Sequence, residues 1–182
     1  MLRDQQLLWG QQGLFVKVCE AVKRYHGSNR TQCAREELAR MKHLIPLNTA
    51  LPFDPRIRIG ELEIDKCKVM SSAKKPLWLV FKNTDAASRS VMVMFKAGDD
   101  LRQDCVTLQL IRVMDKIWRE HGLHFMLTPY RCAATWPMGG LVEIVRDSRT
   151  IADIQHMHGG KLGALMQDSL LQWVLKVRAH CD

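Results

Sequence analysis

Prolines at positions 46, 52 and 55 constrain this 182-residue chain more than any other feature of its sequence. Proline lacks a backbone N–H and fixes its own φ, and it disfavours the helical region for the residue before it. No helix can therefore run through residues 46–60, and this stretch is expected to be an extended linker. The apolar pattern also changes there, so the prolines divide the chain into two zones.

The first zone has helical periodicity. Apolar residues recur at every third or fourth position from Leu7 to about His43, with an interruption at Gly27. This spacing predicts two packed helices, the second covering Thr31 to Leu44.

The second zone has the short apolar runs of β-strands, separated by turn-rich segments. Its residues 106–118 place most of their apolar side chains on one side of a helix, which predicts a helix packed on a sheet. A closing helix is expected from about Gly163 to His180. The five expected antiparallel strands are Leu62–Val69, Leu77–Phe81, Val91–Phe95, Phe125–Leu127 and Leu141–Val145. The fold class is therefore α+β.

Composition excludes several classes of protein. An apolar content of 47% suits one packed core, and the longest apolar runs are too short to cross a bilayer, so a cytoplasmic protein is expected. Six scattered cysteines without a CxxC pair argue against structural zinc and disulfides. The net charge of +8 fits nucleotide phosphates or an anionic membrane surface; no long basic helix suited to nucleic acid is present.

The segment MFKAGDDLRQD, residues 94–104, joins an expected strand to the helix after it. Asp100 and Gln103 have the spacing of a capping box, and Asp99, Asp100 and Arg102 are expected to be structural. Lys96 at the strand end and Asp104 early in the helix match the lysine and acid of a kinase small lobe. Taken alone, Lys96 could equally be a strand-end lysine whose stem packs on apolar surface. A G-x-G-x-x-G loop is absent.

A more specific resemblance rests on several segments in order: CKVMSSAKKPLWLVFKN, MFKAGDDLRQD, LQLIRVMDKIW, PYRC and GLVEIVRDSRTI. Together they resemble the catalytic subunit of a phosphoinositide 3-kinase, and the first segment favours class I. Two positions depart from the family pattern: Cys105 replaces a methionine, and AATWPMGG lacks the usual Thr-Gly loop. The resemblance implies a helical segment at 1–45, the linker at 46–60, a kinase N-lobe at 61–150 and the start of the C-lobe at 151–182.

The resemblance also implies an ATP site. Its phosphate-binding loop would be Val69, Met70, Ser71, Ser72, Ala73, Lys74 and Lys75, in which a serine, backbone N–H groups and a lysine replace a glycine repeat. Without the resemblance, Lys74 and Lys75 would be read as a solvated turn, and the adenine-pocket residues as plain core. The full set of implied ATP-binding residues is Met70, Ser72, Lys74, Pro76, Trp78, Met94, Lys96, Asp104, Tyr130, Val142, Glu143, Ile144, Val145 and Ser148.

The implied activity is transfer of the ATP γ-phosphate to the 3-hydroxyl of inositol lipids. The implied partners are ATP, Mg²⁺, a phosphoinositide at the plasma membrane, a regulatory subunit and a Ras-type GTPase, with no nucleic acid. No D-R-H-x-x-N or D-F-G motif occurs, so the catalytic residues and metal ligands are expected elsewhere, and this chain alone is expected to be an inactive fragment. The alternative is a non-catalytic, kinase-like binding module produced by truncation. The sequence does not indicate which phosphoinositide is preferred.

Overall fold

A computed structural model describes residues 2–27, 29–159 and 168–178 of the chain. They divide into two compact units, residues 1–144 and 145–182. The expected mixed α+β class is confirmed, with helices on one side of an antiparallel sheet in the first unit. Among the described residues, no helix combines the length and apolar character needed to cross a membrane.

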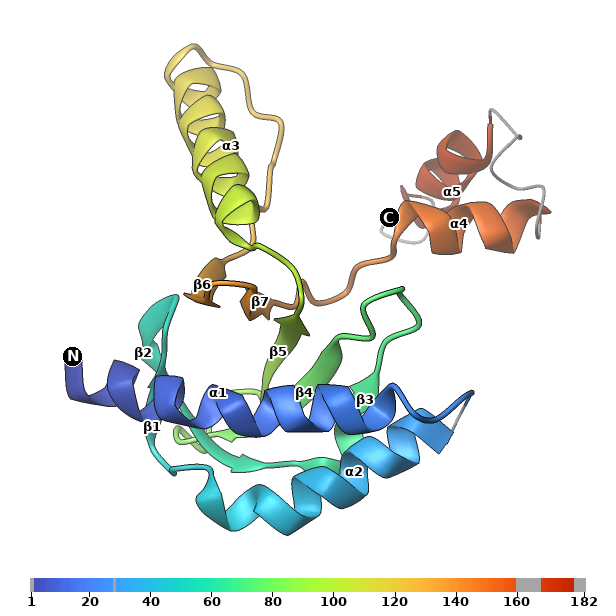
Figure 1. Ribbon diagram of the computed structural model, residues 1–182. Helices are drawn as coiled ribbons and strands as arrows, with labels where there is room; N and C mark the ends of the chain where they lie inside the picture. The colour runs from blue at the N-terminus through green and yellow to red at the C-terminus, as the bar shows by residue number, and fades with distance from the viewer. Residues whose placement is uncertain (1, 28, 160–167, 179–182) are drawn as a thin grey trace. The chain divides into compact units, whose positions relative to one another are not determined.

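Two helices form one layer of the first unit. Helix α1 (Leu2–Val22) and helix α2 (Asn29–Met41) contact each other and the sheet (Figure 1). Their buried residues include Phe15, Val18, Val22 and Leu38, at the helical spacing expected from the sequence. A short 3₁₀ helix η1 (Lys42–Leu44) ends the helical layer two residues before Pro46.

The sheet has seven strands, whereas five were expected. Its main path runs in the order β1-β2-β4-β5-β7-β6, and β3 pairs with β4. Every pair is antiparallel. The strands are β1 (Thr49–Leu51), β2 (Asp54–Leu62), β3 (Lys68–Val69), β4 (Leu77–Asn83), β5 (Val91–Ala97), β6 (Cys132–Trp136) and β7 (Gly139–Glu143).

Residues 46–60 account for part of the difference. The prolines exclude helix there, as expected, but β1 and most of β2 pair with each other across this stretch. Pro55 is the second residue of β2, next to the irregular pairing at Ala50 and Leu51 of β1, and proline is tolerated at such a bulge. The expectation of a free extended linker is therefore wrong.

Two expected strands also need correction. Leu62–Val69 is not one strand, because a 3₁₀ turn η2 (Ile64–Lys66) separates the end of β2 from β3. Phe125–Leu127 is not a strand: Met126 has a φ of 54°, and the Phe125 ring packs edge-on against Trp118 with centroids 5.0 Å apart. The strand that pairs with β7 begins seven residues later, at Cys132.

Helix α3 (Arg102–Glu120) exists as expected but does not pack its apolar side on the sheet. Leu108, which does not lie on the apolar side of the helix, is the residue that α3 buries, and the helix contacts β6. The apolar side is exposed through Val106, Leu110, Val113, Met114 and Ile117. The chain after α3 returns alongside the helix (Figure 1).

The second unit contains helix α4 (Ile151–Gly159), which the sequence analysis did not identify, and helix α5 (Ser169–Arg178). The expected closing helix from Gly163 to His180 is confirmed over residues 169–178; its two ends lie outside the described residues. In α5, Leu170, Leu171 and Val174 are exposed and Trp173 is half-buried.

Candidate functional site

The two faces of the central strands carry different side chains, because successive residues of a strand point to opposite sides. Leu77, Leu79, Val93 and Phe95 belong to the core shared with α1 and α2. The alternate residues Trp78 and Met94 therefore face away from these helices and are half-buried. This second face is the candidate functional site.

Strand register brings three of the implied ATP-binding residues into one row. Trp78 on β4 lies opposite Met94 on β5, and Met94 lies opposite Val142 on β7. Directly opposed residues on one face of a sheet are close enough for their side chains to touch. Residues separated by more than sixty positions in sequence thus form one continuous apolar surface.

Lys96 lies on the same face as this row, two residues beyond Met94 along β5. It is half-buried and lies opposite Gly140 on β7. A Cβ on Gly140 would overlap the Ala133 carbonyl oxygen of β6. Only glycine at position 140 therefore permits β6 and β7 to approach so closely. The Lys96 ammonium is therefore carried by a tightly paired part of the sheet.

The expected phosphate-binding loop is a tight turn between β3 and β4. The Met70 N–H donates to the Pro76 carbonyl at 2.9 Å, and the Lys75 N–H donates to the Ser72 carbonyl at 3.1 Å. Lys75 adopts a φ of 51°, and its Nζ donates to the Ser71 carbonyl at 3.0 Å. Lys75 therefore holds the turn together.

Lys74 in the same loop is exposed and points toward the end of β5. Its Nζ lies 3.9 Å from the position that a Cβ on Gly98 would occupy, two residues after Lys96. The loop and β5 therefore present two cationic side chains, Lys74 and Lys96, to one region. Ser72 is exposed in the same turn.

Asp104 and Tyr130 lie in a polar neighbourhood with Cys132. Burial, and then the negative charge of Asp104, raise the pKa of the Tyr130 hydroxyl. Burial and the neighbouring Cys105 thiol raise the pKa of Cys132 to about 12; Asp104 adds to this rise and Lys96 opposes it. Within the described part of the chain, no ion pair joins Lys96 to Asp104. Both lie close enough to Cys132 to shift its pKa, in opposite directions.

The segment from Glu143 to Val145 leaves the sheet at the division between the two units. The Glu143 N–H donates to the Arg131 carbonyl at 2.8 Å, and its carboxylate accepts from the Arg131 N–H at 2.9 Å. The Ile144 N–H donates to the Met92 carbonyl at 3.4 Å. In the second unit, the Ser148 hydroxyl donates to the Val145 carbonyl at 2.8 Å.

Asp100 and Arg102 are structural, as the sequence analysis expected. Asp100 accepts from the Arg102 N–H at 3.1 Å and from the guanidinium at 2.8 and 2.6 Å. The guanidinium lowers the pKa of Asp100 to about 2. The carboxylate thus satisfies an N–H at the start of α3. The expected capping box of Asp100 and Gln103 is wrong, because the cap residue is Leu101 and it makes no side-chain cap hydrogen bond.

Comparison with known proteins gives the same assignment as the ordered sequence motifs. Residues 90–179 match the family of phosphatidylinositol 3- and 4-kinases. The chain is 43% identical over 158 residues to phosphatidylinositol 3-kinase 2 of Dictyostelium discoideum, an alignment covering 86% of this chain and 8% of the relative. The chain belongs to the phosphatidylinositol 3-kinase family.

Two further relatives from Dictyostelium discoideum agree. Phosphatidylinositol 3-kinase 3 is 42% identical over 157 residues, covering 86% of this chain and 9% of the relative. Phosphatidylinositol 3-kinase 1 is 46% identical over 132 residues, covering 72% and 8%. The chain thus spans less than a tenth of the length of these phosphatidylinositol 3-kinases.

The sequence analysis of this phosphatidylinositol 3-kinase chain did not identify Lys68, Arg131 or Asp54 as neighbours of the site. The Lys68 ammonium lies 4.6 Å from the centroid of the Trp78 ring, a cation–π contact between β3 and β4. Arg131 forms ion pairs with Asp54 of β2 and with Glu143, so it ties the end of β7 to a distant strand. Lys68 could have been found from its place opposite Trp78 in a hairpin; no sequence pattern marks the Arg131–Asp54 pair.

Proposed function

We propose that this chain is the ATP-binding lobe of a class I phosphatidylinositol 3-kinase. The complete enzyme would transfer the ATP γ-phosphate to the 3-hydroxyl of an inositol lipid. The observation that carries the proposal is the apolar row Trp78–Met94–Val142 with Lys96 beside it on one face of the sheet. An adenine ring needs such an apolar surface, and the attached phosphates need cations at its end.

The adenine would lie against this row, with Met70 and Pro76 closing the side toward the phosphate-binding loop. Backbone groups at the end of β7, at Glu143 and Ile144, would hydrogen-bond the edge of the ring. The family resemblance also implies Val145 and Ser148, which belong to the second unit. The N–H bonds that Glu143 and Ile144 make within the sheet give this segment a defined position.

Lys96, Lys74 and Ser72 would bind the phosphates. Phosphoryl transfer depends chiefly on positioning and on cations that stabilise the charge of the transferring group. Asp104 and Tyr130 would act as positioning residues: their polar neighbourhood reaches Lys96 through Cys132. Lys68 over the Trp78 ring would stiffen the loop wall.

Mg²⁺ would neutralise triphosphate charge in the complete enzyme. Among the described residues, no cluster of three or more His, Cys, Asp or Glu side chains could hold a metal ion. The family resemblance implies that the Mg²⁺ ligands, the catalytic base and the lipid-binding loop would lie in the large lobe of the full-length kinase, whose start would be residues 151–182. The other proposed domains of the chain are a helical segment at residues 1–45 and a kinase N-lobe at residues 61–150.

The class I assignment rests on the CKVMSSAKKPLWLVFKN segment. It implies a regulatory subunit, a Ras-type GTPase as a further partner, and recruitment from the cytoplasm to the plasma membrane, where the phosphoinositide lies. The net charge of +8 is compatible with that surface.

Replacement of Lys96 by methionine tests the proposal in the full-length kinase. Methionine keeps the length of the apolar stem and removes the charge, so we expect phosphoinositide 3-phosphorylation to be lost while the fold persists. Lys82→Met is the matched control, because Lys82 is an exposed strand lysine paired with Glu61 and lies away from the site. Unchanged lipid phosphorylation by the Lys96 variant would disprove the site.

A further inference from the structure

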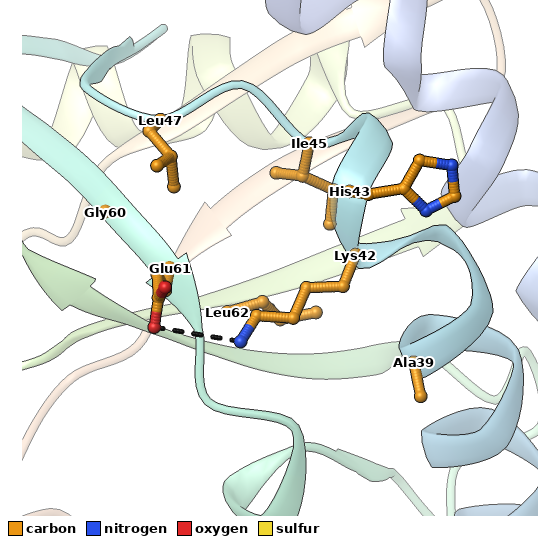
Figure 2. A pocket seen from close by; sticks show the side chains of 8 residues that line it. All are labelled: Ala39, Lys42, His43, Ile45, Leu47, Gly60, Glu61 and Leu62. Atoms are coloured by element: carbon orange, nitrogen blue, oxygen red, sulfur yellow. Dashed lines mark ion pairs between the residues drawn. The ribbon is translucent and has the colours of Figure 1, made fainter.

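A cavity separate from the proposed ATP site lies between the helical layer and β2 (Figure 2). It encloses about 400 Å³, a volume in the range of small-molecule sites. It shares no residue with the proposed ATP site. The residues that line it are Ala39, Lys42, His43, Ile45, Leu47, Gly60, Glu61 and Leu62.

The cavity combines an apolar wall with a charged edge. Ile45 and Leu62 are buried, and Leu47 is 63% exposed at the rim. In Figure 2 the Ile45 and Leu47 side chains point toward the space in front of β2, and the Lys42–Glu61 ion pair crosses one side of it. The His43 ring points away from this pair. The arrangement suits a ligand with an apolar body and one polar end.

The charged edge contains two lysines for one carboxylate. Lys82 donates a hydrogen bond to Glu61 at 3.1 Å, whereas Lys42 lies at 3.7 Å, beyond hydrogen-bonding distance. The hydrogen bond from Lys82 is the largest cause of the lowered pKa of Glu61, and the charge of Lys42 is the next. Lys42 can therefore turn to an incoming anion while Lys82 continues to neutralise Glu61.

We propose that this cavity binds a monocarboxylate with an aliphatic chain of medium length, of the medium-chain fatty acid type. Its carboxylate would pair with the Lys42 ammonium, and its chain would lie against Ile45, Leu47 and Leu62. Two ammonium groups and one carboxylate leave a net charge of +1 at this edge, which matches one carboxylate better than a dianionic phosphate. This inference is independent of the ATP site.

Ligand-observed NMR titration of the full-length kinase with octanoate tests the proposal. Octanol has a chain of the same length without the charge, acetate has the head group without the chain, and octyl phosphate has a dianionic head group. We expect octanoate to bind at least about fivefold more tightly than each of them, as expected for a partly exposed charge pair. Equal binding of octanol, or tighter binding of octyl phosphate, would overturn the monocarboxylate assignment.

Substitutions then locate the site. Lys42→Met should weaken octanoate binding about fivefold, and Glu61→Gln should strengthen it, because the competing carboxylate is removed. Both side chains are more than one-third exposed, at 41% and 48%, so the fold should tolerate these changes. Lys66→Met is the matched control: it removes another exposed Lys–Glu pair, the one with Glu63, and should leave binding unchanged. Unchanged binding in the Lys42 variant, or weaker binding in the Glu61 variant, would disprove the site.

Discussion

The Phe15 ring on α1 packs against the Phe95 ring on β5, with centroids 5.4 Å apart and planes at 47°. Phe95 is followed directly by Lys96, which lies on the opposite face of the strand. The core contact between the helical layer and the sheet therefore supports the strand that carries the proposed phosphate-binding lysine. The helices therefore support the unit that carries the proposed nucleotide site, and this relationship gives a first prediction.

Phe15→Ala should lower the free energy of unfolding by about 3–5 kcal/mol, because it deletes a buried aromatic ring and leaves a cavity. Urea unfolding followed by circular dichroism measures this loss. Phe125→Ala is the control, since Phe125 is 57% exposed and its contact with Trp118 should contribute far less. Equal losses in the two variants would contradict the central place of Phe15 in the core.

The proposed link between Lys96 and Asp104 predicts non-additive substitutions. Asp104→Ala should lower lipid kinase activity by misplacing Lys96, and the loss should add little once Lys96 is methionine, because residues that act as a unit are not additive. Because the Lys96 variant is expected to lose lipid phosphorylation, a double-mutant cycle on ATP affinity measures the coupling. Losses that add fully would show that Asp104 acts independently of Lys96.

Gly140→Ala should disrupt the pairing of β6 with β7 beside Lys96. An added Cβ would overlap the Ala133 carbonyl oxygen and stand 2.9 Å from the Thr135 nitrogen, both of them backbone atoms that cannot move aside cheaply. We expect loss of stability and weaker ATP binding in the full-length kinase, measured by thermal unfolding and by nucleotide titration. Gly13→Ala is the control, because nothing lies within 4 Å of a Cβ there. Similar behaviour of the two variants would argue against close packing at Gly140.

The Asp100–Arg102 contact predicts a pH-dependent start of α3. The pKa of Asp100 is about 2 in the folded chain against an ordinary value of 3.8. Since the folded pKa is depressed, its stabilising effect is fully present above about pH 4 and is lost as the pH falls through about 2. Carboxyl NMR of Asp100 should show this titration, and Arg102→Met should return the pKa toward 3.8. An unchanged pKa in that variant would show that Arg102 is not the cause.

The exposed apolar side of α3 predicts self-association of residues 1–182 on their own. Val113 and Leu110 are 54% and 58% exposed, and so large an apolar surface favours contact with other molecules. Replacing both by glutamine should shift the chain toward the monomer in analytical ultracentrifugation. Replacing Arg112 and Lys116 on the polar side by glutamine should not. A monomeric unsubstituted chain would contradict this prediction.

Local sequence patterns determined which elements form. The short, continuous apolar runs of residues 77–81 and 91–95 predicted β4 and β5. The helical spacing before residue 46 predicted α1 and α2, because this spacing reflects burial of one side of a helix. The ordered motifs around Lys96 also identified the family, since many matched segments rarely occur together by chance. Asp100 could be assigned to the helix start, although not to a capping box, because side-chain hydrogen bonds to nearby N–H groups act over a few residues.

The tertiary structure alone decided what depends on contacts between distant residues. Strand register brought Trp78, Met94 and Val142 into one row, although they lie on three strands separated in sequence. It also made strands of residues 49–62, where the prolines suggested a linker, because each strand there had a neighbour to pair with. The Arg131–Asp54 ion pair and the cavity beside Lys42 likewise arise between segments that no local pattern relates. Periodicity reports which side of an element is buried, whereas pairing and packing depend on which other element meets that side.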